Sequence, residues 1–456
     1  MIVSTMPIGP STETAVGTDD QRAIAGCDRS HTSQRQPAVS EIGLATAEIP
    51  SGETPGVGHE PQHGIRILLI LSALLAFASI STDLYLPAMP IMAASLHADD
   101  GMMALTVSGY LAGFSTGQLF WGPFSDRFGR RLPVALGCLL FIAGSAGCAL
   151  ANDGTSMIGW RVVQALGACA NVVLARAMVR DLYAGRRAAQ KMSTLMTIMA
   201  VAPLAGPTVG GQILQLLSWQ AIFWTLVLLG LATLASLVLL PETLPSDRRS
   251  PTSLRTIMQR YRLLLGTPKF LAYIATGGFF YAGTFAYIAG SPFAYIAYHH
   301  VNPQWYGALF GAGIVGLMLT NQLNARLLNH YDTDVLLLVG GLVSAIAGSV
   351  IAFTTWGDWG GLSVLISGCF LFVTATGFVL ANAITGALNC LPQYSGTASA
   401  LAGAMQHGAG ILGSALVARF ADGTPWPMGL VTGICGLGCL LSATCVLWTT
   451  HQSDHL

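Results

Sequence analysis

Long apolar runs separated by short polar connections dominate the chain from residue 65 onward. Twelve of these segments approach or exceed the roughly 20 residues that an α-helix needs to cross a bilayer core of about 30 Å. They are centred on 67–88, 104–124, 132–151, 156–178, 192–216, 219–240, 270–297, 304–325, 335–355, 360–384, 396–418 and 427–449. The pattern predicts an all-α membrane protein with twelve transmembrane helices.

Polar stretches divide the chain into parts. Residues 1–64 are rich in Ser, Thr, Gly, Pro and Glu and have no apolar run, which predicts a disordered tail without a signal peptide. The longest internal connection, 241–267, separates six apolar segments from six. We therefore expect helical bundles at 65–240 and 268–450, followed by a short tail at 451–456.

The long connection contains its own periodic pattern. Leu254, Ile257, Met258 and Tyr261 recur at helical spacing between arginines. This spacing favours an amphipathic helix on the inner leaflet, although a plain solvated linker would have a similar composition.

The distribution of charged residues predicts how the segments are oriented in the membrane. Only 9% of residues are charged and the formal net charge is zero, so composition favours a membrane protein and gives no sign of nucleic-acid binding. Lys and Arg concentrate after every second segment, at 127–131, 176–191, 248–269 and 326, and Arg419 is the exception. Because cytoplasmic loops hold the excess of basic residues, both termini are expected in the cytoplasm.

Metal binding and disulfides are not expected. The nine cysteines form no C-x-x-C pair, and most lie in apolar segments. The tail contains an H-E-x-x-H sequence at 59–63, but Pro61 opposes the helix that would bring the two imidazoles together. We predict neither a metal nor a cofactor.

Two charged residues fall inside apolar segments, each near the outer end. Asp83 lies in Ser81–Pro90 of the first segment, and Arg161 lies in the fourth. A charge at membrane depth costs at least about 2.5–3.5 kcal/mol on insertion scales, so such residues usually face a wet cavity and serve ion or substrate movement. We expect the two to pair across the bundle. The alternative for Asp83 is an acid at the membrane boundary, beside Pro87 and Pro90.

The connection after the second segment reads Gly-Pro-Phe-Ser-Asp-Arg-Phe-Gly-Arg-Arg from residue 122. It resembles the G-x-x-x-D-R-x-G-R-R/K loop of the major facilitator superfamily. The alternative is a positive-inside turn with an incidental acid, which the specificity of the match disfavours. The resemblance implies two pseudo-symmetric six-helix bundles, with Asp126 docking on the opposite half and Arg130 in a charge relay. It assigns a conformational gate to Gly122, Asp126, Arg127, Gly129, Arg130 and Arg131.

The fourth segment also resembles a motif of this superfamily. Its R-x-x-Q-G-type pattern, implicated in proton coupling, matches Arg161 and Gln164, with Ala165 where glycine is usual. The resemblance therefore implies that Asp83, Arg161 and Gln164 serve proton coupling.

The fifth segment contains a P-x-x-G-P-x-x-G-G string. Small residues at this spacing permit close helix packing, and packing alone is the simpler explanation. The string also resembles the motif of drug:proton antiporters, which implies export and assigns this motif to Pro203, Gly206, Pro207, Gly210 and Gly211. With 81–90, 175–183 and 240–244, it makes residues 65–450 similar to the bicyclomycin/chloramphenicol-resistance (Bcr/CflA) branch.

Several polar and aromatic positions within the apolar segments are candidates for a substrate cavity, although aromatic residues in a bundle more often serve packing. We assign to it Tyr85, Tyr110, Asn171, Phe280, Tyr281, Asn382 and Gln406. His407 could titrate near neutral pH, but we interpret it as a satisfied core histidine.

A catalytic interpretation is disfavoured. Gly113–Gly117 matches the G-x-S-x-G pattern of a nucleophilic serine, but Ser115 lies inside a helical segment rather than on a strand-to-helix turn. No His with an orienting acid is evident, so we predict that the chain is not an enzyme.

The predicted function is proton-coupled efflux of small amphipathic drugs, such as chloramphenicol- or bicyclomycin-like compounds, by a monomer in the lipid bilayer. Asp83 would gain a proton in the outward-open state and lose it in the inward-open state, where drug and Arg161 favour the ionised form. The alternative is a proton-coupled exporter or symporter of a metabolite such as a sugar or an amino acid. The P-x-x-G-P-x-x-G-G string of the fifth segment argues against symport but not against export of a metabolite.

Overall fold

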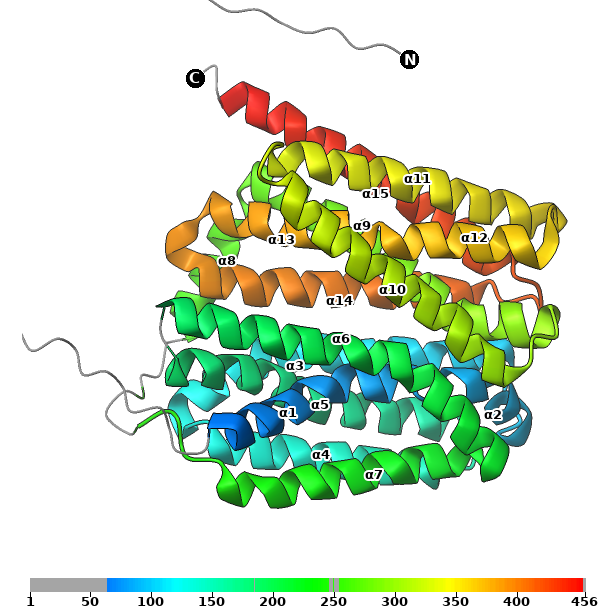
Figure 1. Cartoon of the computed structure of the whole chain (residues 1–456), viewed down its shortest axis with the longest axis horizontal. Helices are drawn as coiled ribbons and strands as arrows, with labels where there is room; N and C mark the ends of the chain where they lie inside the picture. Colours follow the sequence, from blue (N-terminus) through cyan, green and yellow to red (C-terminus); the bar gives the residue numbers. More distant parts are fainter. Residues whose placement is uncertain (1–63, 184, 246–248, 250–253, 454–456) are drawn as a thin grey trace, which may run out of the picture. The chain divides into compact units, whose positions relative to one another are not determined.

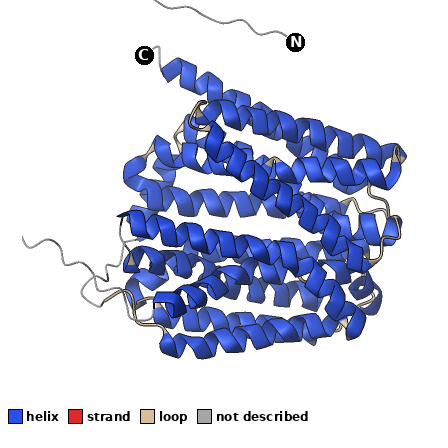
Figure 2. Ribbon diagram, viewed as in Figure 1, coloured by secondary structure: helices blue, strands red, loops and turns tan. Residues whose placement is uncertain are grey.

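The computed structural model describes residues 64–183, 185–245, 249 and 254–453, all within the compact unit Glu60–Leu456. The predicted disordered tail and its H-E-x-x-H sequence lie almost wholly outside the described residues. Within the described part the secondary structure is helical, without a strand (Figure 2).

The helices follow the predicted apolar segments closely. The first half contains α1 (Gly64–Asp83), η1 (Leu86–Ala88), α2 (Met89–Ser95), α3 (Asp100–Phe128), α4 (Arg131–Ala149), α5 (Gly154–Leu182), α6 (Gly185–Leu216), α7 (Trp219–Ser236) and η2 (Leu237–Leu239). The second contains α9 (Pro268–Pro292), the π-helix η4 (Phe293–Tyr298), α10 (Pro303–Leu327), α11 (Thr333–Gly357), α12 (Gly361–Thr374), α13 (Thr376–Cys390), η5 (Pro392–Tyr394), α14 (Ser395–Arg419) and α15 (Trp426–Ser453).

All twelve predicted segments are helical, and the tenth forms two consecutive helices, α12 and α13. Among the described residues, ten stretches are long and apolar enough to cross a membrane. Helices α3 and α6 are not among those ten, yet they occupy the second and fifth predicted positions.

Polar residues at the connections determine where several helices begin. The carboxylates of Asp99 and Asp153 accept hydrogen bonds from the backbone N–H three residues on, at 2.6 and 2.8 Å, and so cap α3 and α5. Ser218 caps α7 in the same way. Each cap satisfies a donor that the helix leaves free at its first turn.

The helices of each half pack mainly on one another (Figure 1). In the first half α5 packs against α1, α3 and α4, and in the second α9 packs against α13, α14 and α15. The halves meet along two main helix pairs, α3 with α14 and α6 with α10. Large apolar side chains such as Leu228, Leu319 and Leu441 are exposed on the outside, as expected for a surface in contact with lipid.

The connection between the halves contains the predicted helix, α8 (Leu254–Leu265). Tyr261 is half-buried, Met258 is exposed, and the Arg260 guanidinium lies 5.5 Å from the ring centre of Tyr394. The helix packs against α9 and α14 of the second half. The helical interpretation of this connection is confirmed.

Candidate functional site

Two adjoining cavities lie between the halves. The first, here called the vestibule, has a volume of about 390 Å³ and is lined by residues of α3, α5, α8 and α14 at the end with the arginine-rich connections. The second, the central cavity, measures about 310 Å³ and reaches Asp83. Both are lined by Gln118, Arg176, Ser399 and Gly403. The two cavities therefore form a path from the arginine-rich end of the helices to Asp83.

Asp83 is the last residue of α1 and lines the central cavity with only 5% of its surface exposed. Helix α6 packs directly on this region through the glycines of its repeated motif. A Cβ atom at Gly206 would lie 3.2 Å from the Cβ of Asp83, and one at Gly210 would lie 1.8 Å from the carbonyl oxygen of Leu84. The second contact is impossible for any residue with a side chain, so this glycine permits the close approach of α6 to the acid.

Arg161 is completely buried beside this acid. Its Nη1 donates to the carbonyl oxygen of Ser81 at 2.9 Å and to Oε1 of Gln164 at 2.6 Å. The guanidinium carbon lies 4.3 Å from the ring centre of Tyr85 and 4.4 Å from that of Tyr110. These contacts spread the charge over two aromatic faces and a backbone carbonyl.

The expected direct pairing of Asp83 with Arg161 is not present in this conformation. Across the described residues, no hydrogen bond or ion pair joins the two side chains. Ser81, two residues before Asp83, takes the guanidinium hydrogen bond instead, so the charge of Arg161 acts on Asp83 at a distance.

Of the seven predicted cavity residues, three line the central cavity: Tyr110, Tyr281 and Gln406. Tyr85 lies against Arg161 and is hydrogen-bonded to Thr106 at 3.0 Å. The other three are buried elsewhere, because each has a packing or hydrogen-bonding partner within its own half. Asn382 is paired with Asn324 at 2.9 Å, Phe280 is stacked on Phe372, and Asn171 lies between α4 and α5.

Aromatic rings form one wall of the central cavity. The imidazole of His407 is stacked on Phe114 with 4.7 Å between ring centres and lies 5.1 Å from the ring centre of Tyr281. Its Nδ1 is 2.7 Å from the carbonyl oxygen of Gly403. His407 thus has the expected hydrogen-bond partner, but it lines the cavity instead of lying in a closed core.

Arg176 is a cavity residue that was not predicted. Its position in the sequence placed it with the cytoplasmic connection, whereas the side chain is accessible inside the path and lines both cavities. The spacing contained the signal, because Arg176 lies one helical turn further into α5 than Arg180.

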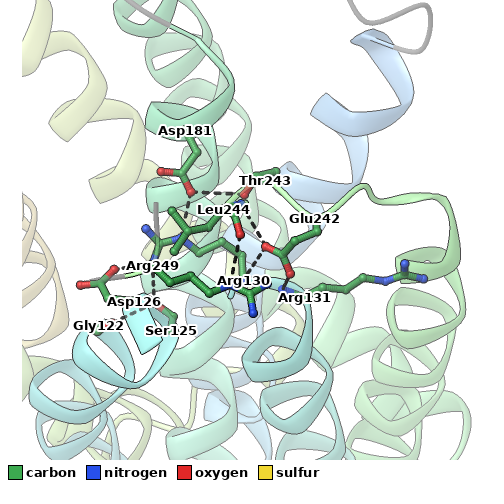
Figure 3. Close-up of polar contacts among 10 residues, drawn as sticks. All are labelled: Gly122, Ser125, Asp126, Arg130, Arg131, Asp181, Glu242, Thr243, Leu244 and Arg249. Carbon is green, nitrogen blue, oxygen red and sulfur yellow. Dashed lines mark hydrogen bonds and ion pairs between the residues drawn. The ribbon is translucent and has the colours of Figure 1, made fainter. Parts of the chain in front are cut away.

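At the arginine-rich end, Arg130 is the centre of a polar network (Figure 3). Its Nε donates to Asp181 at 2.8 Å, and its Nη1 donates to Asp126 at 2.7 Å and to the hydroxyl of Ser125 at 2.6 Å. Thr243 donates to the same oxygen of Asp181 at 3.2 Å. Burial lowers the pKa of Arg130, but these carboxylates outweigh it and hold the pKa above its ordinary value, so the guanidinium stays charged.

Glu242 closes this network from the connection after α7 and was also missed. Its carboxylate accepts the backbone N–H groups of Arg130 at 2.8 Å, Arg131 at 3.2 Å and Leu244 at 3.0 Å. Partial burial raises the pKa of Glu242, but the backbone donors and Arg249 lower it further, so the net shift is downward. The acid caps the start of α4 and binds it to the chain that leaves the first half.

The predicted gate residues lie together, but they do not bridge the halves here. Asp126 lines the vestibule and pairs with Arg130 of its own half, so the expected docking on the opposite half is absent from this conformation. A Cβ at Gly122 would meet nothing within 4 Å. Arg127 lies over Phe128, and the side chain of Arg131 is exposed.

Gly129 has a different role from Gly122. It ends α3 with φ +88°, and a Cβ there would lie 2.7 Å from Nη2 of Arg249 and 2.8 Å from Oε2 of Glu242. A side chain would be strained at this backbone angle and would displace the network.

The opposite end of the helices is closed. The hydroxyls of Ser108 and Ser414 are 2.7 Å apart across α3 and α14. A Cβ at Gly101 would lie 2.5 Å from the carbonyl oxygen of Ala418, and one at Gly307 would lie 2.5 Å from the backbone nitrogen of Thr208. The structure is therefore open at the arginine-rich end and closed at the other.

The remaining sequence hypotheses concern catalysis and metals. The hydroxyl of Ser115 donates to the carbonyl oxygen of Ala404 at 3.0 Å, a contact between helices of the two halves. Within the described ranges no cluster of His, Cys, Asp or Glu could hold a metal ion.

Comparison with known proteins agrees with this architecture. The sequence pattern of the Major Facilitator Superfamily matches residues 69–414, and the chain belongs to this family of membrane transporters rather than to an enzyme family. Among solved structures, a D-xylose-proton symporter aligns with a TM-score of 0.68 at 15% identity, covering 84% of this chain and 97% of the other. This likeness supports the predicted all-α fold with two halves.

Curated relatives narrow the resemblance. An uncharacterized MFS-type transporter, YdgK, of Bacillus subtilis is 34% identical over 82% of this chain and 94% of the relative. A bicyclomycin resistance protein homolog of Haemophilus influenzae is 30% identical over 81% and 92% of the two chains. A chloramphenicol resistance protein of Pseudomonas aeruginosa is 29% identical over 82% and 90%. The expected resemblance to the bicyclomycin/chloramphenicol-resistance branch is confirmed.

Proposed function

We propose that this transporter expels small amphipathic drugs, such as chloramphenicol- or bicyclomycin-like compounds, in exchange for protons. The observation that carries the proposal is the position of Asp83. It is a nearly buried carboxyl group that faces the central cavity, lies under the glycines of α6 and has the charge of Arg161 nearby. The names of the resistance-protein relatives support drugs as the solute class.

Competition between proton and drug is the proposed mechanism. An acid in a cavity open to one side exchanges protons with that side only. When drug enters the central cavity, its contacts and the nearby Arg161 favour release of the proton from Asp83. When the cavity opens to the other side, drug leaves and the acid is protonated again. In this scheme Gln164 fixes Arg161 at 2.6 Å, so the charge keeps its position through the cycle.

We also propose an orientation and a cellular location for the transporter. We infer a bacterial inner membrane with both termini in the cytoplasm, so that the vestibule opens to the cytoplasm in this conformation. Bundles at 65–240 and 268–450 would move against each other about the central cavity, with the connection 241–267 between them. The transporter is proposed to act as a monomer in lipid, with no cofactor and no nucleic acid.

Drug-induced proton movement in inverted membrane vesicles tests this function. Wild type and Asp83→Asn are compared under an imposed pH gradient with a drug panel that includes chloramphenicol-like compounds. Asp153→Asn is the matched control, because Asp153 is exposed on a connection and asparagine caps a helix as well as aspartate does. Drugs should drive proton movement in wild type and in the control and not in Asp83→Asn.

Two results would overturn parts of the proposal. Efflux by Asp83→Asn at the wild-type rate, with equal expression, would remove Asp83 from the coupling step. Proton movement driven by a sugar or an amino acid, with no response to any drug, would replace drug export with metabolite transport.

A further inference from the structure

The charges along the path are strongly unbalanced. Four arginines line the vestibule, and its single acid, Asp126, is already bound by one of them, Arg130. The other three are Arg176, Arg180 and Arg260. In the part of the chain that the structure describes, none of these three lies within salt-bridge distance of a carboxylate. A solute entering from this end therefore meets uncompensated positive charge.

Arg176 continues this charge into the central cavity. Of the residues that line that cavity, only Asp83 and Arg176 have a carboxyl or a guanidinium group; the titratable His407 also lines it. When Asp83 is protonated, the positive charge of Arg176 has no counter-charge inside the cavity. A cation inside a membrane protein is costly, and it is usually retained where it faces a wet pathway and binds something there.

The same cavity offers an aromatic surface and unsatisfied amides. Phe114, His407 and Tyr281 form a continuous group of rings beside Arg176. Oε1 of Gln118 and Nε2 of Gln406 are buried and have no hydrogen-bond partner. Buried polar atoms are normally paired, so an amide on a cavity wall without a partner is a candidate contact for a bound solute.

From these observations we propose that the substrates are small aromatic solutes with an anionic or strongly electron-rich acceptor group, such as a carboxylate or a nitro group, and that Arg176 selects for that group. The solute's ring lies on the wall formed by Phe114, His407 and Tyr281, while its acceptor group takes the guanidinium hydrogen bonds of Arg176. This inference deepens the proposed drug export and rests on it for the direction of transport. A full negative charge at Arg176 opposes ionisation of Asp83 in the same cavity, so proton release is expected to be stronger with a neutral nitro solute than with a carboxylate solute.

The physical reason for selection is differential electrostatics. A carboxylate gains charge-assisted, bidentate hydrogen bonds from a guanidinium, and a nitro group accepts the same donors more weakly. A lipophilic cation of equal size would pass Arg180 and Arg260 and then meet Arg176, and its charge would be repelled by all three. Among the residues that line the cavity, only the ionised form of Asp83 would attract this cation.

A matched set of probes tests this selection. Three benzene derivatives of similar size are used, carrying a carboxylate, a nitro group or a trimethylammonium group at one position and the same apolar group opposite. Equilibrium dialysis with the purified full-length transporter measures binding, and inverted vesicles measure transport and proton movement. The variants are Arg176→Gln, Arg176→Lys and the control Arg326→Gln, which removes an exposed arginine outside both cavities.

We expect wild type and Arg326→Gln to bind the carboxylate probe at least about tenfold more tightly than the trimethylammonium probe, a difference of about 1.4 kcal/mol. Arg176→Gln should lose at least about tenfold in affinity for the carboxylate probe and bind the cation more tightly than wild type does. Arg176→Lys keeps the charge and should retain most of the preference, with a weaker response to the nitro group because lysine lacks the planar fork.

The results that would contradict selection by Arg176 differ from those that would contradict antiport. Equal binding of the carboxylate and cationic probes by wild type, or unchanged binding by folded Arg176→Gln, overturns selection by Arg176 and leaves antiport intact. Selective binding without proton movement for any probe overturns antiport and leaves the site. If Arg176→Gln does not fold, the wild-type order of the three probes and the Arg176→Lys variant decide.

Discussion

The two ends of the helix bundle differ in how they are built. At the arginine-rich end, polar contacts lie within the first half, where Arg130 binds Asp126 and Asp181, and a cavity separates that half from α14. At the other end, small residues bring backbones of opposite halves into contact, as at Gly307 and Thr208. One end is held by charge inside a half and the other by close packing between halves.

This difference suggests how the two ends respond to change. Contacts within a half are unchanged when that half moves as a rigid body, so we expect the Arg130 network to persist when the first half moves. Close packing weakens sharply once the backbones separate, because a gap of about 0.5–1 Å already forfeits about a quarter to a half of the dispersion attraction. The closed end should therefore set the balance between conformations, and the network should set the integrity of the first half.

The largest effect is expected from Arg130→Ala, which breaks the network. It leaves Asp126 and Asp181 without their cation; removing one partner of a buried pair costs about 3–5 kcal/mol, and the partial exposure of Asp126 reduces this to about 2–3 kcal/mol. Thermal unfolding of the purified protein measures the loss. Arg131→Ala, which removes an exposed neighbouring side chain, is the control and should leave Tm within about 1 °C. Equal stability of both variants would mean that the network is not structural.

Gly307→Ala should weaken the closed end. The new methyl group would lie 2.5 Å from the backbone nitrogen of Thr208, and overpacking of this kind costs about 1–3 kcal/mol. The population should shift towards a state open at this end, with a roughly tenfold fall in transport. Labelling of a cysteine introduced at Ser108 by an impermeant thiol reagent reports the opening. Gly159→Ala, with nothing within 4 Å of its Cβ, is the matched control. Equal labelling in both would contradict the role of packing.

Gly122→Ala tests whether the arginine-rich end closes. In the present conformation the added methyl group meets no atom within 4 Å, so stability should not fall. If α3 approaches α14 in the other conformation, the methyl group will obstruct it and slow transport by about three- to tenfold, the effect of about 1 kcal/mol. Unfolding and transport are measured on the same preparation. Unchanged transport would show that α14 does not approach this surface.

The smallest effect is expected from Glu242→Gln. The folded-state pKa of Glu242 lies below its ordinary value of 4.5, so its contribution to stability is present above that value and is lost as pH falls through the lower folded pKa. The variant should unfold about 1 °C below wild type at pH 7, and the difference should vanish in acid. A difference that persists in acid below the folded-state pKa of Glu242 would indicate that the backbone hydrogen bonds do not need the charge.

The helices were predictable because lipid imposes a simple rule on them. Every spanning segment must be long, apolar and helical, so the periodicity and length of the runs identified all twelve. The same rule failed to separate α12 from α13, because the break lies in an uninterrupted apolar run. The amino-acid composition of an apolar segment does not show where its backbone departs from a regular helix.

The site was less predictable because it depends on which neighbour each side chain meets. Asp83 was found from its cost in an apolar segment, and Gly210 from a motif. The role of Asn382 was missed because its partner, Asn324, is 58 residues away in another helix. Arg176 was missed because an arginine near a helix end can lie in a loop or in a cavity, and only the packing of α3 and α14 decides which.

The helix between the halves gives the vestibule a mechanical limit. Arg249 is hydrogen-bonded at 3.4 Å to Leu244 beside the Arg130 network, whereas α8, which begins at Leu254, packs on the second half. The chain between these two residues extends to at most about 18 Å at 3.3–3.6 Å per residue. While both contacts hold, the two halves can therefore part at this point only as far as this covalent tether reaches.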